Sequence, residues 1–441
     1  MSLITPIKIE KLQKALHTKA KEEVEFRFYQ LYDKVYRTDV LAHAYRLCRS
    51  NGGAAGVDGT QFEEIESYGI EVWLDELAKN LRKKTFQADP VRRVWIPKAN
   101  GKQRPLGIPT IRDRVVQTAV VLILQPIFEA DLQPEQYAYR PNRSAQDAVR
   151  HVHGLVRSGF NEVVDADLSG YFDTIPHAEL MRSVARRVSD RHVLSLVKQW
   201  LVAPVEEDDG KGGRRRTTRA KDDKKGVPQG APISPLLSNL YMRRFLLGWK
   251  VLGHQQRLHA YIVNYADDFV ICCWGTAAEA MVAMRFMMDR LKLTVNEDKT
   301  SLRRLSAQSV NFLGYTIGWC YSPKTGRAYI GTRPSKQSIQ RVTSRISELT
   351  TRRMSLLEAD EVVQRLNRLL TGWGNYFCLG PVSGAYRAVD MHTGHRLRQW
   401  LRRKHKVKNQ GYTRYSGEYL YEQLGLVCLQ TRTRDFPWAK V

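Results

Sequence analysis

The stretch AYIVNYADDFVICC runs from Ala260 to Cys273 and is the most informative part of the chain. Its Val, Ile, Tyr and Phe residues predict buried β-strand, and the adjacent Asp267 and Asp268 interrupt the apolar run at its midpoint. Because burying two unpaired carboxylates costs several kcal/mol, the pair indicates a compensating cation, and a hard divalent metal ion suits carboxylate oxygens. A solvated acidic hairpin tip is the alternative that this stretch alone leaves open.

A second acidic strand lies upstream, in VVDADLSGYFDTI from Val163 to Ile175. Asp165 and Asp167 share one face of that strand because side chains alternate with a period of two, so one of them can meet Asp267 and Asp268 across neighbouring strands. Three carboxylates from two strands are what two-metal phosphoryl transfer requires: one ion lowers the pKa of an attacking 3′-hydroxyl, and the other neutralises the leaving pyrophosphate. We therefore expect three carboxylates to converge on two ions roughly 3.5 to 4 Å apart.

These motifs resemble a known family. Tyr265-Ala266-Asp267-Asp268, together with DLSGYFD from Asp167 to Asp173, is similar to the palm signature of reverse transcriptases, specifically the bacterial group II intron reverse transcriptases, also called maturases. Four further blocks follow the family's order: IPKANGKQRPLGIPTIRDRVVQ (96–117), QYAYRPNRSAQDAV (136–149), GVPQGAPISPLLSNLYM (226–242) and VNFLGYTI (310–317). An ordered set of blocks is far more specific than any one motif.

The resemblance implies an α+β fold: a right-hand polymerase with fingers and an antiparallel palm sheet, followed by an α-helical thumb or maturase domain. We expect a basic helical N-terminal extension over 1–60, fingers and palm over 61–330, the helical domain over 331–406 and a short basic tail over 407–441. His392, His395 and His405 lack paired Cys-x-x-Cys elements or nearby carboxylates, so we expect no His-Asn-His endonuclease.

The resemblance also implies roles for individual residues. The catalytic and metal-binding set, holding two Mg²⁺ ions, is Asp167, Asp267, Asp268 and the backbone of Leu168. The dNTP-binding set is Lys98, Arg104, Phe172, Gln229 and Lys299. The set expected to contact template or other RNA is Tyr139, Arg140, Asn142, Arg341 and Arg345.

The residue types suit these roles. Asn100-Gly101 is a favoured tight turn, which would put Lys98 and Arg104 on opposing strands where they can clamp a triphosphate. A flat ring at Phe172 can exclude a ribonucleotide 2′-hydroxyl, and the Gln229 amide offers both a donor and an acceptor near a base pair. The alternatives are solvated strand charges for the two cations and core packing for the aromatic rings.

Composition agrees with a nucleic-acid partner. Lys and Arg number 70 against 45 Asp and Glu, a net charge of +25 that indicates a polyanionic partner. A merely basic surface or anionic lipid is the alternative, but no run of about eighteen apolar residues occurs and the start MSLITPIKIE has no apolar signal core, so we expect no membrane. The 6 scattered cysteines suit a reducing compartment, and we expect a bacterial cytoplasmic protein that joins the nucleoid when bound to DNA.

Periodicity predicts the remaining elements. Helices are expected over 11–49, 63–84 and 111–128, followed by a mobile loop or hairpin insertion over 205–225 and three basic helices after about residue 329. Ile339, Val342, Ile346 and Leu349 form the apolar stripe of the first of these three helices.

Together these features predict an RNA-directed DNA polymerase of a group II intron that also binds intron RNA to assist splicing and mobility, through reverse splicing and target-primed cDNA synthesis. Its partners would be group II intron RNA, an RNA template with a DNA primer, target DNA and dNTPs. A domesticated or defence-associated reverse transcriptase without a parent intron is one alternative. An RNA-binding splicing cofactor with a vestigial polymerase is another, which the intact carboxylates disfavour. The oligomeric state stays open.

Overall fold

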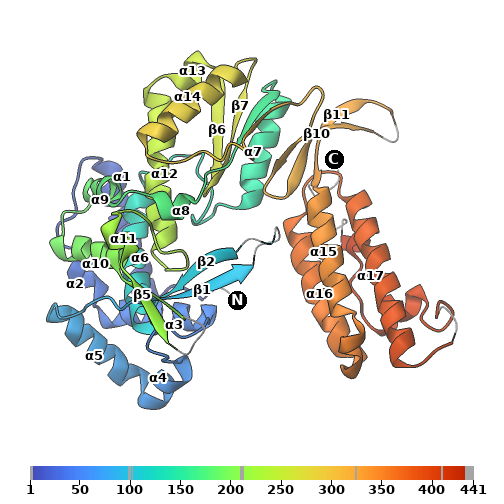
Figure 1. The fold of residues 1–441 in the computed structure, drawn as a ribbon, viewed down its shortest axis with the longest axis horizontal. Helices are drawn as coiled ribbons and strands as arrows, with labels where there is room; N and C mark the ends of the chain where they lie inside the picture. The colour runs from blue at the N-terminus through green and yellow to red at the C-terminus, as the bar shows by residue number, and fades with distance from the viewer. Residues whose placement is uncertain are drawn as a thin grey trace.

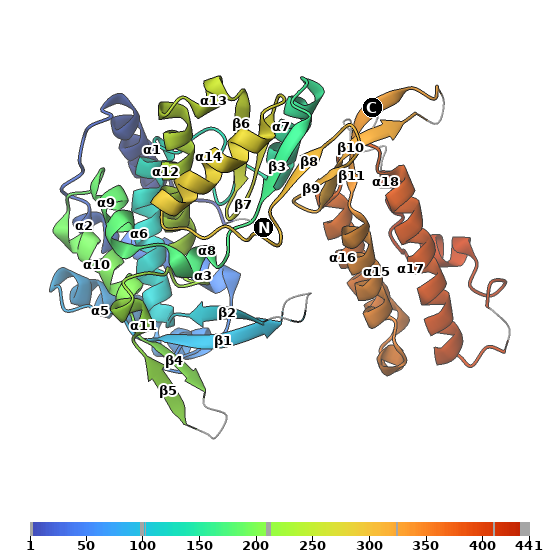
Figure 2. The same ribbon diagram turned by 45° about the horizontal axis from the view of Figure 1, so that its top comes forward.

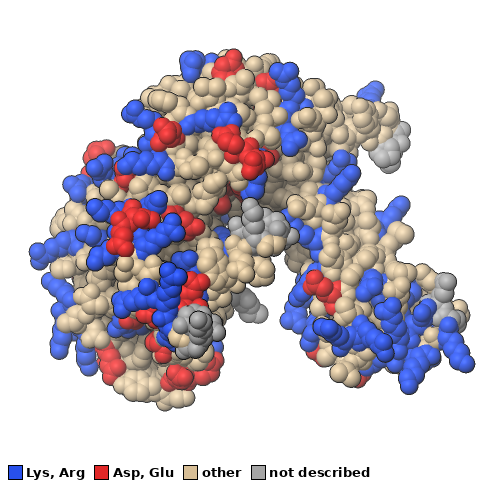
Figure 3. All heavy atoms as spheres, viewed as in Figure 1, with Lys and Arg blue, Asp and Glu red and all other residues tan. Residues whose placement is uncertain are grey.

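The computed structural model describes residues 3–97, 101, 103–208, 213–322, 325–408 and 411–432. Within these residues the strands form three sheets, and helices surround them in a mixed α/β arrangement. A large body carries two of the sheets, and the C-terminal helices stand beside it across an open gap (Figure 1, Figure 3). The third sheet joins the body to these helices (Figure 2).

The central sheet contains the strands on both sides of the paired aspartates. Its order is β6-β7-β3-β8 and every pairing is antiparallel; the strands are β6 (Ala260–Tyr265), β7 (Asp268–Cys273), β3 (Glu162–Ala166) and β8 (Ser301–Arg304). Alternate residues enter two different cores, as a period of two requires: Val163 and Cys272 belong to one, Val164 and Ile271 to the other. Helix α7 (Ala145–Arg157) covers the first face, and α14 (Ala277–Arg290) with α12 (Ser234–Val251) covers the second.

A second sheet forms the edge of the body. Its order is β2-β1-β4-β5, with the strands β1 (Val91–Pro97), β2 (Gln103–Ile108), β4 (Val205–Asp208) and β5 (Arg214–Thr217). Strands β4 and β5 pair antiparallel, which confirms a hairpin in the insertion expected over 205–225. Strand β4 also pairs in parallel with β1, which joins this insertion to the β1–β2 hairpin. Figure 2 shows both hairpins projecting from the same side of the body.

Helices fill the rest of the body. The longest is α6 (Ile111–Glu129), which is buried along most of its length and begins at an N-cap hydroxyl from Thr110. The others are α8 (Tyr171–Thr174), α9 (His177–Ala185), α10 (Arg191–Val202), α11 (Arg219–Asp222) and α13 (His254–Arg257).

The prediction of two continuous helices near the N-terminus is wrong. The segment 11–49 is divided into α1 (Ile7–Glu22), α2 (Tyr32–Val35) and α3 (Thr38–Asn51), because Phe28 pairs with Val188 as an isolated β-bridge. The segment 63–84 is divided into α4 (Phe62–Tyr68) and α5 (Ile70–Arg82) at Gly69, whose φ of 107° lies outside the helical region.

The C-terminal region begins with the third sheet and has its own core. Strands β9 (Val310–Phe312), β10 (Tyr315–Tyr321) and β11 (Ala328–Pro334) lead into α15 (Lys336–Leu349), α16 (Ala359–Tyr376) and α17 (Ser383–Lys404). The expected stripe on α15 is confirmed, because Val342 and Ile346 are buried in this core and Ile339 and Leu349 pack against it. The short elements are the 3₁₀ turn Arg352–Leu356, the π-helical turn Tyr419–Gln423 and α18 (Leu429–Arg432).

Gly380 sits where the loop after α16 meets β11. Its φ is +71°, and a Cβ there would lie 2.0 Å from the carbonyl oxygen of Thr332. We expect Gly380→Ala to lower the free energy of unfolding by about 2 to 4 kcal/mol, because both the backbone conformation and the contact are lost. Chemical denaturation measures this change.

Gly384→Ala is the matched control for this substitution. Nothing lies within 4 Å of a Cβ at Gly384, so this variant should equal or slightly exceed the wild-type stability. Equal stabilities of the two variants would contradict the close contact at Gly380.

Candidate active site

The two adjacent aspartates lie at the turn between β6 and β7. Tyr265 pairs with Asp268, which leaves Ala266 and Asp267 as the turn residues, and Ala266 adopts a φ of 58°. The buried side chain of Asn264 supports this left-handed conformation: its Nδ2 donates a hydrogen bond to the carbonyl oxygen of Ala266 at 2.8 Å. The turn therefore holds Asp267 and Asp268 at one end of the central sheet.

Strand β3 delivers Asp167 to the same end. Ala166 pairs with Phe269, so Asp167 follows one residue beyond the last paired position, in the direction of Asp268. One of its carboxylate oxygens accepts hydrogen bonds from Asn296 Nδ2 and Lys299 Nζ, each at 2.9 Å. The carboxylate is thus neutralised by a cation from the segment before β8.

Like charges perturb one another in this cluster. Burial, together with repulsion from Asp267, Asp167 and Asp165, raises the pKa of Asp268 to about 6, although part of the side chain is open to solvent. Burial likewise raises the pKa of Asp165 to about 6, and the hydrogen bond to Asp167 raises the pKa of Lys299. The site is therefore a negative cluster that gains from a bound cation.

The three carboxylates are neighbours but do not form a finished metal site. Among the described residues, no three His, Cys, Asp or Glu side chains are gathered in a geometry that could hold a metal ion. The expected convergence is therefore incomplete in the described residues, where Asp167 is hydrogen-bonded to Asn296 and Lys299. The donor set nevertheless suits a hard divalent ion, since it consists of carboxylate oxygens whose mutual repulsion a cation relieves. Leu168, whose backbone was expected to contribute, faces Val295 in an isolated β-bridge.

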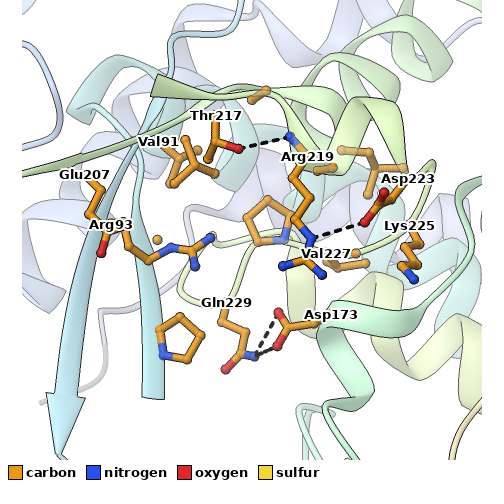
Figure 4. Close-up of a pocket in the computed structure, with 18 of the residues that line it drawn as sticks. Val91, Arg93, Asp173, Glu207, Thr217, Arg219, Asp223, Lys225, Val227 and Gln229 are labelled. Carbon is orange, nitrogen blue, oxygen red and sulfur yellow. Dashed lines mark hydrogen bonds and ion pairs between the residues drawn. The ribbon is translucent and has the colours of Figure 1, made fainter. Parts of the chain in front are cut away.

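The residues expected to bind dNTP lie on four separate segments: the β1–β2 hairpin, α8, the loop before α12 and the segment before β8. Arg104 on β2 donates from Nε to Gln229 Oε1 at 2.9 Å. Gln229 Nε2 donates to both Asp173 carboxylate oxygens at 3.2 and 3.3 Å (Figure 4). Phe172 is buried and meets Tyr171 edge-on, with 5.6 Å between ring centroids. Lys98 lies outside the described residues.

The residues expected to bind template differ in exposure. Tyr139 is half exposed, and its pKa is raised by burial and then by Asp267, so it lies beside the turn. Asn142 is exposed with a φ of 57°, whereas the Arg140 guanidinium is buried against Glu129 and donates to two backbone carbonyls. The Arg140 guanidinium is therefore engaged in contacts within the protein. Exposed positions on α15 carry Arg341 and Arg345, and Arg345 pairs with Glu348.

Two further residues near the site were missing from the expected set. Asp173 ends the DLSGYFD motif. Its position directly after Phe172 is the sequence feature that could have placed it near the nucleotide site. Tyr376 ends α16, and its hydroxyl donates to the carbonyl oxygen of Leu313 at 3.0 Å. Burial, with smaller contributions from Tyr265 and Asp268, raises the pKa of Tyr376 to about 12, so the C-terminal helices reach the vicinity of the carboxylates.

No helix in the described part of the chain has the length and apolar character needed to cross a membrane. Lys and Arg side chains cover much of the visible surface of the C-terminal helices in Figure 3.

Two family models match the chain. Residues 96–317 match the model described as “Reverse transcriptase (RNA-dependent DNA polymerase)”, which includes the central sheet and all three aspartates. Residues 339–416 match “Group II intron, maturase-specific domain”, which includes nearly all of α15 and the whole of α16 and α17.

Known proteins are similar over most of the chain. “Protein YkfC” of Escherichia coli (strain K12) is 33% identical over 348 residues, which are 70% of this chain and 88% of that protein. “Group II intron-encoded protein LtrA” of Lactococcus lactis subsp. cremoris is 26% identical over 360 residues, 68% of this chain and 58% of that protein. The solved structure titled “Partial Cas6-RT-Cas1--Cas2 complex” matches 59% of this chain and 42% of its own, at 20% identity and a TM-score of 0.36, too low for a structural argument.

The reverse transcriptase match spans half of the chain and contains the carboxylate cluster, and the maturase-specific match covers the helices that follow. The chain therefore belongs to the family of group II intron-encoded reverse transcriptase/maturase proteins and is an RNA-directed DNA polymerase.

Proposed function

We propose that this polymerase is built as a right hand around the central sheet. In this proposal the sheet is the palm, the β1–β2 hairpin belongs to the fingers and α15 to α17 form the thumb. The extension covers 1–60, fingers and palm 61–330, and the helical domain 331–406. The observation that supports it best is the meeting of Asp167 from β3 with Asp268 from β7 at one end of an antiparallel sheet.

The proposed metal site uses Asp167, Asp267, Asp268 and the backbone of Leu168 to hold two Mg²⁺ ions. When bound, the ions supply a lowered pKa at the primer 3′-hydroxyl and charge stabilisation at the leaving pyrophosphate. Lys299 neutralises Asp167 through an ion pair in which the Lys299 side chain is 61% exposed. Such an exposed pair is worth about 0 to 1 kcal/mol, so it opposes metal binding only slightly.

The remaining residues bind and select the nucleotide in this proposal. Arg104 presents a planar guanidinium to the triphosphate, with Lys98 expected beside it and Lys299 near the same phosphates. Gln229 lies by the nascent base pair, and the Phe172 ring excludes a ribonucleotide 2′-hydroxyl. The burial of Phe172 supports this role, since close packing prevents the ring from rotating away from a bound nucleotide.

We propose that the same chain binds group II intron RNA and assists its splicing and mobility. The net charge of +25 and the Lys and Arg on the C-terminal helices support this, since phosphate contacts supply most non-specific affinity for nucleic acid. Arg341 and Arg345 on α15, with Tyr139 and Asn142 beside the site, are the proposed RNA contacts. The partners are intron RNA, an RNA template with its DNA primer, target DNA and dNTPs, used in reverse splicing and target-primed cDNA synthesis.

Metal dependence tests the proposed chemistry. Purified protein given an RNA template, an annealed DNA primer, dNTPs and Mg²⁺ should extend the primer, and excess EDTA should reduce the rate at least about a thousandfold. Adding Mg²⁺ beyond the chelator should restore extension. Gel analysis of labelled primer measures the rate, and a template-free reaction is the control. Undiminished extension in EDTA would contradict the proposed site.

A further inference from the structure

Three chain segments meet at the side chain of Gln229. Its Oε1 accepts a hydrogen bond from Arg104 Nε at 2.9 Å, and its Nε2 donates to the Asp173 carboxylate at 3.2 and 3.3 Å. Figure 4 shows the Gln229 amide turned toward Asp173 at the edge of a cavity of about 620 Å³. The cavity extends from there to Arg219 and Asp223, on and beside α11.

The chemistry of the two neighbours fixes the orientation of this amide. A guanidinium group can only donate hydrogen bonds, and an ionised carboxylate can only accept them. A reversed Gln229 amide would place N–H groups against Arg104 and an oxygen against Asp173, which loses both bonds and brings like partial charges together. The observed orientation is therefore the one that these partners permit.

The backbone holds the three segments in place. Val227 N donates to the carbonyl oxygen of Phe172 at 2.7 Å, which fixes the loop before Gln229 against α8. Gly107 N donates to the carbonyl oxygen of Gln229 at 2.7 Å, which fixes the same loop to β2. A Cβ at Gly230 would lie 2.7 Å from the Gly107 carbonyl oxygen, so this approach needs glycine. The side-chain bridge therefore joins elements that are already aligned.

We propose that Asp173 is a positioning residue for dNTP binding. By accepting from Gln229 Nε2, it turns the amide oxygen to Arg104 and fixes the guanidinium through Nε. The Nη1 and Nη2 groups of Arg104 are then left for the triphosphate, in the bidentate manner that guanidinium groups use with phosphate. Asp173 acts through Gln229 and Arg104 and touches neither the nucleotide nor the metal ions. This inference rests on the proposed role of Arg104.

Steady-state kinetics on the full chain tests this assignment. Asp173→Ala removes the acceptor and should raise the KM for dNTP about fivefold, the usual size of one hydrogen bond, while kcat changes less than twofold. Asp173→Asn keeps an acceptor oxygen and should recover most of the loss. Asp223→Ala is the matched control: it is a carboxylate of the same cavity that pairs with Arg219 instead, and its KM should equal that of the wild type.

A double-mutant cycle separates positioning from a general structural effect. In a Gln229→Ala background Asp173 has no amide to orient, so adding Asp173→Ala should leave KM unchanged. Multiplying effects in the double variant, an equal KM change in Asp223→Ala, or a loss in kcat alone would each overturn the inference. Thermal unfolding of every variant verifies folding. Failure of the wild type to extend a primer would reject the proposed function itself, whereas wild-type behaviour of Asp173→Ala would reject only this inference.

Discussion

Replacing Asp267 and Asp268 together by alanine is expected to reduce primer extension on an RNA template by on the order of 10⁴-fold or more, because residues that act as one catalytic unit fail together. The two carboxylates share the β6–β7 turn, and burial together with the neighbouring carboxylates raises the pKa of Asp268 to about 6. Their removal leaves Asp167 with Lys299 and Asn296, a group that cannot hold two ions. Labelled primer extension under saturating dNTP measures the loss.

RNA binding supplies the internal control for this variant. The substitutions lie in a solvent-facing turn, so filter binding of structured RNA should stay within about twofold of the wild type, in line with phosphate contacts made elsewhere. Asp289→Ala is the matched carboxylate substitution, since Asp289 is exposed on α14, and it should retain full activity. Extension that persists in the double variant would rule out these residues as metal ligands.

Arg187→Met is expected to lower the free energy of unfolding by about 3 to 5 kcal/mol. The Arg187 side chain is 1% exposed and lies 3.3 Å from Asp131, which is itself buried. Its guanidinium also donates to the backbone carbonyls of Ala20, Glu23, Val24 and Phe26. Methionine would fill the volume but leave Asp131 paired with the more exposed Arg186 and several carbonyl groups without donors.

Limited proteolysis locates this loss in the chain. Because Arg187 ties the segment after α1 to the body, cleavage should begin near residues 20–30 and precede global unfolding. Arg182→Met, an exposed arginine of α9, is the control and should leave both stability and cleavage unchanged. A wild-type melting curve for Arg187→Met would show that the N-terminal segment is held by its apolar contacts alone.

Local patterns predicted the parts of this fold that local chemistry decides. The period-two runs around Asp267 and Asp165 predicted β6, β7 and β3, since each strand alternates between two buried faces. The stripe on α15 followed from helical spacing in the same way. The break in the expected helix over 11–49 had no local signal, because it arises from pairing of Phe28 with Val188, far along the chain.

In the candidate site, too, residue types could be predicted from the sequence, whereas contacts between distant segments could not. Residue types and motif order indicated Asp167, Asp267 and Asp268, but the engagement of Asp167 by Asn296 and Lys299 depends on how the segment before β8 folds back. Arg140 shows the opposite case. Its motif suggested a template contact, whereas the partly buried carboxylate of Glu129 is a partner that only the tertiary structure brings to it. Charge type can be read from sequence, but the partner of a charge cannot.

Tyr376 is shared by two parts of the molecule. It ends α16, yet its hydroxyl holds the turn between β9 and β10 through Leu313, and its carbonyl oxygen accepts from Gln146 on α7. The last turn of α16 therefore cannot move independently of the body without breaking these hydrogen bonds. A nucleic-acid strand bound by the C-terminal helices would therefore be held at a fixed position relative to the carboxylates. Loss of the Tyr376 contacts would displace the 3′ end of the primer from them.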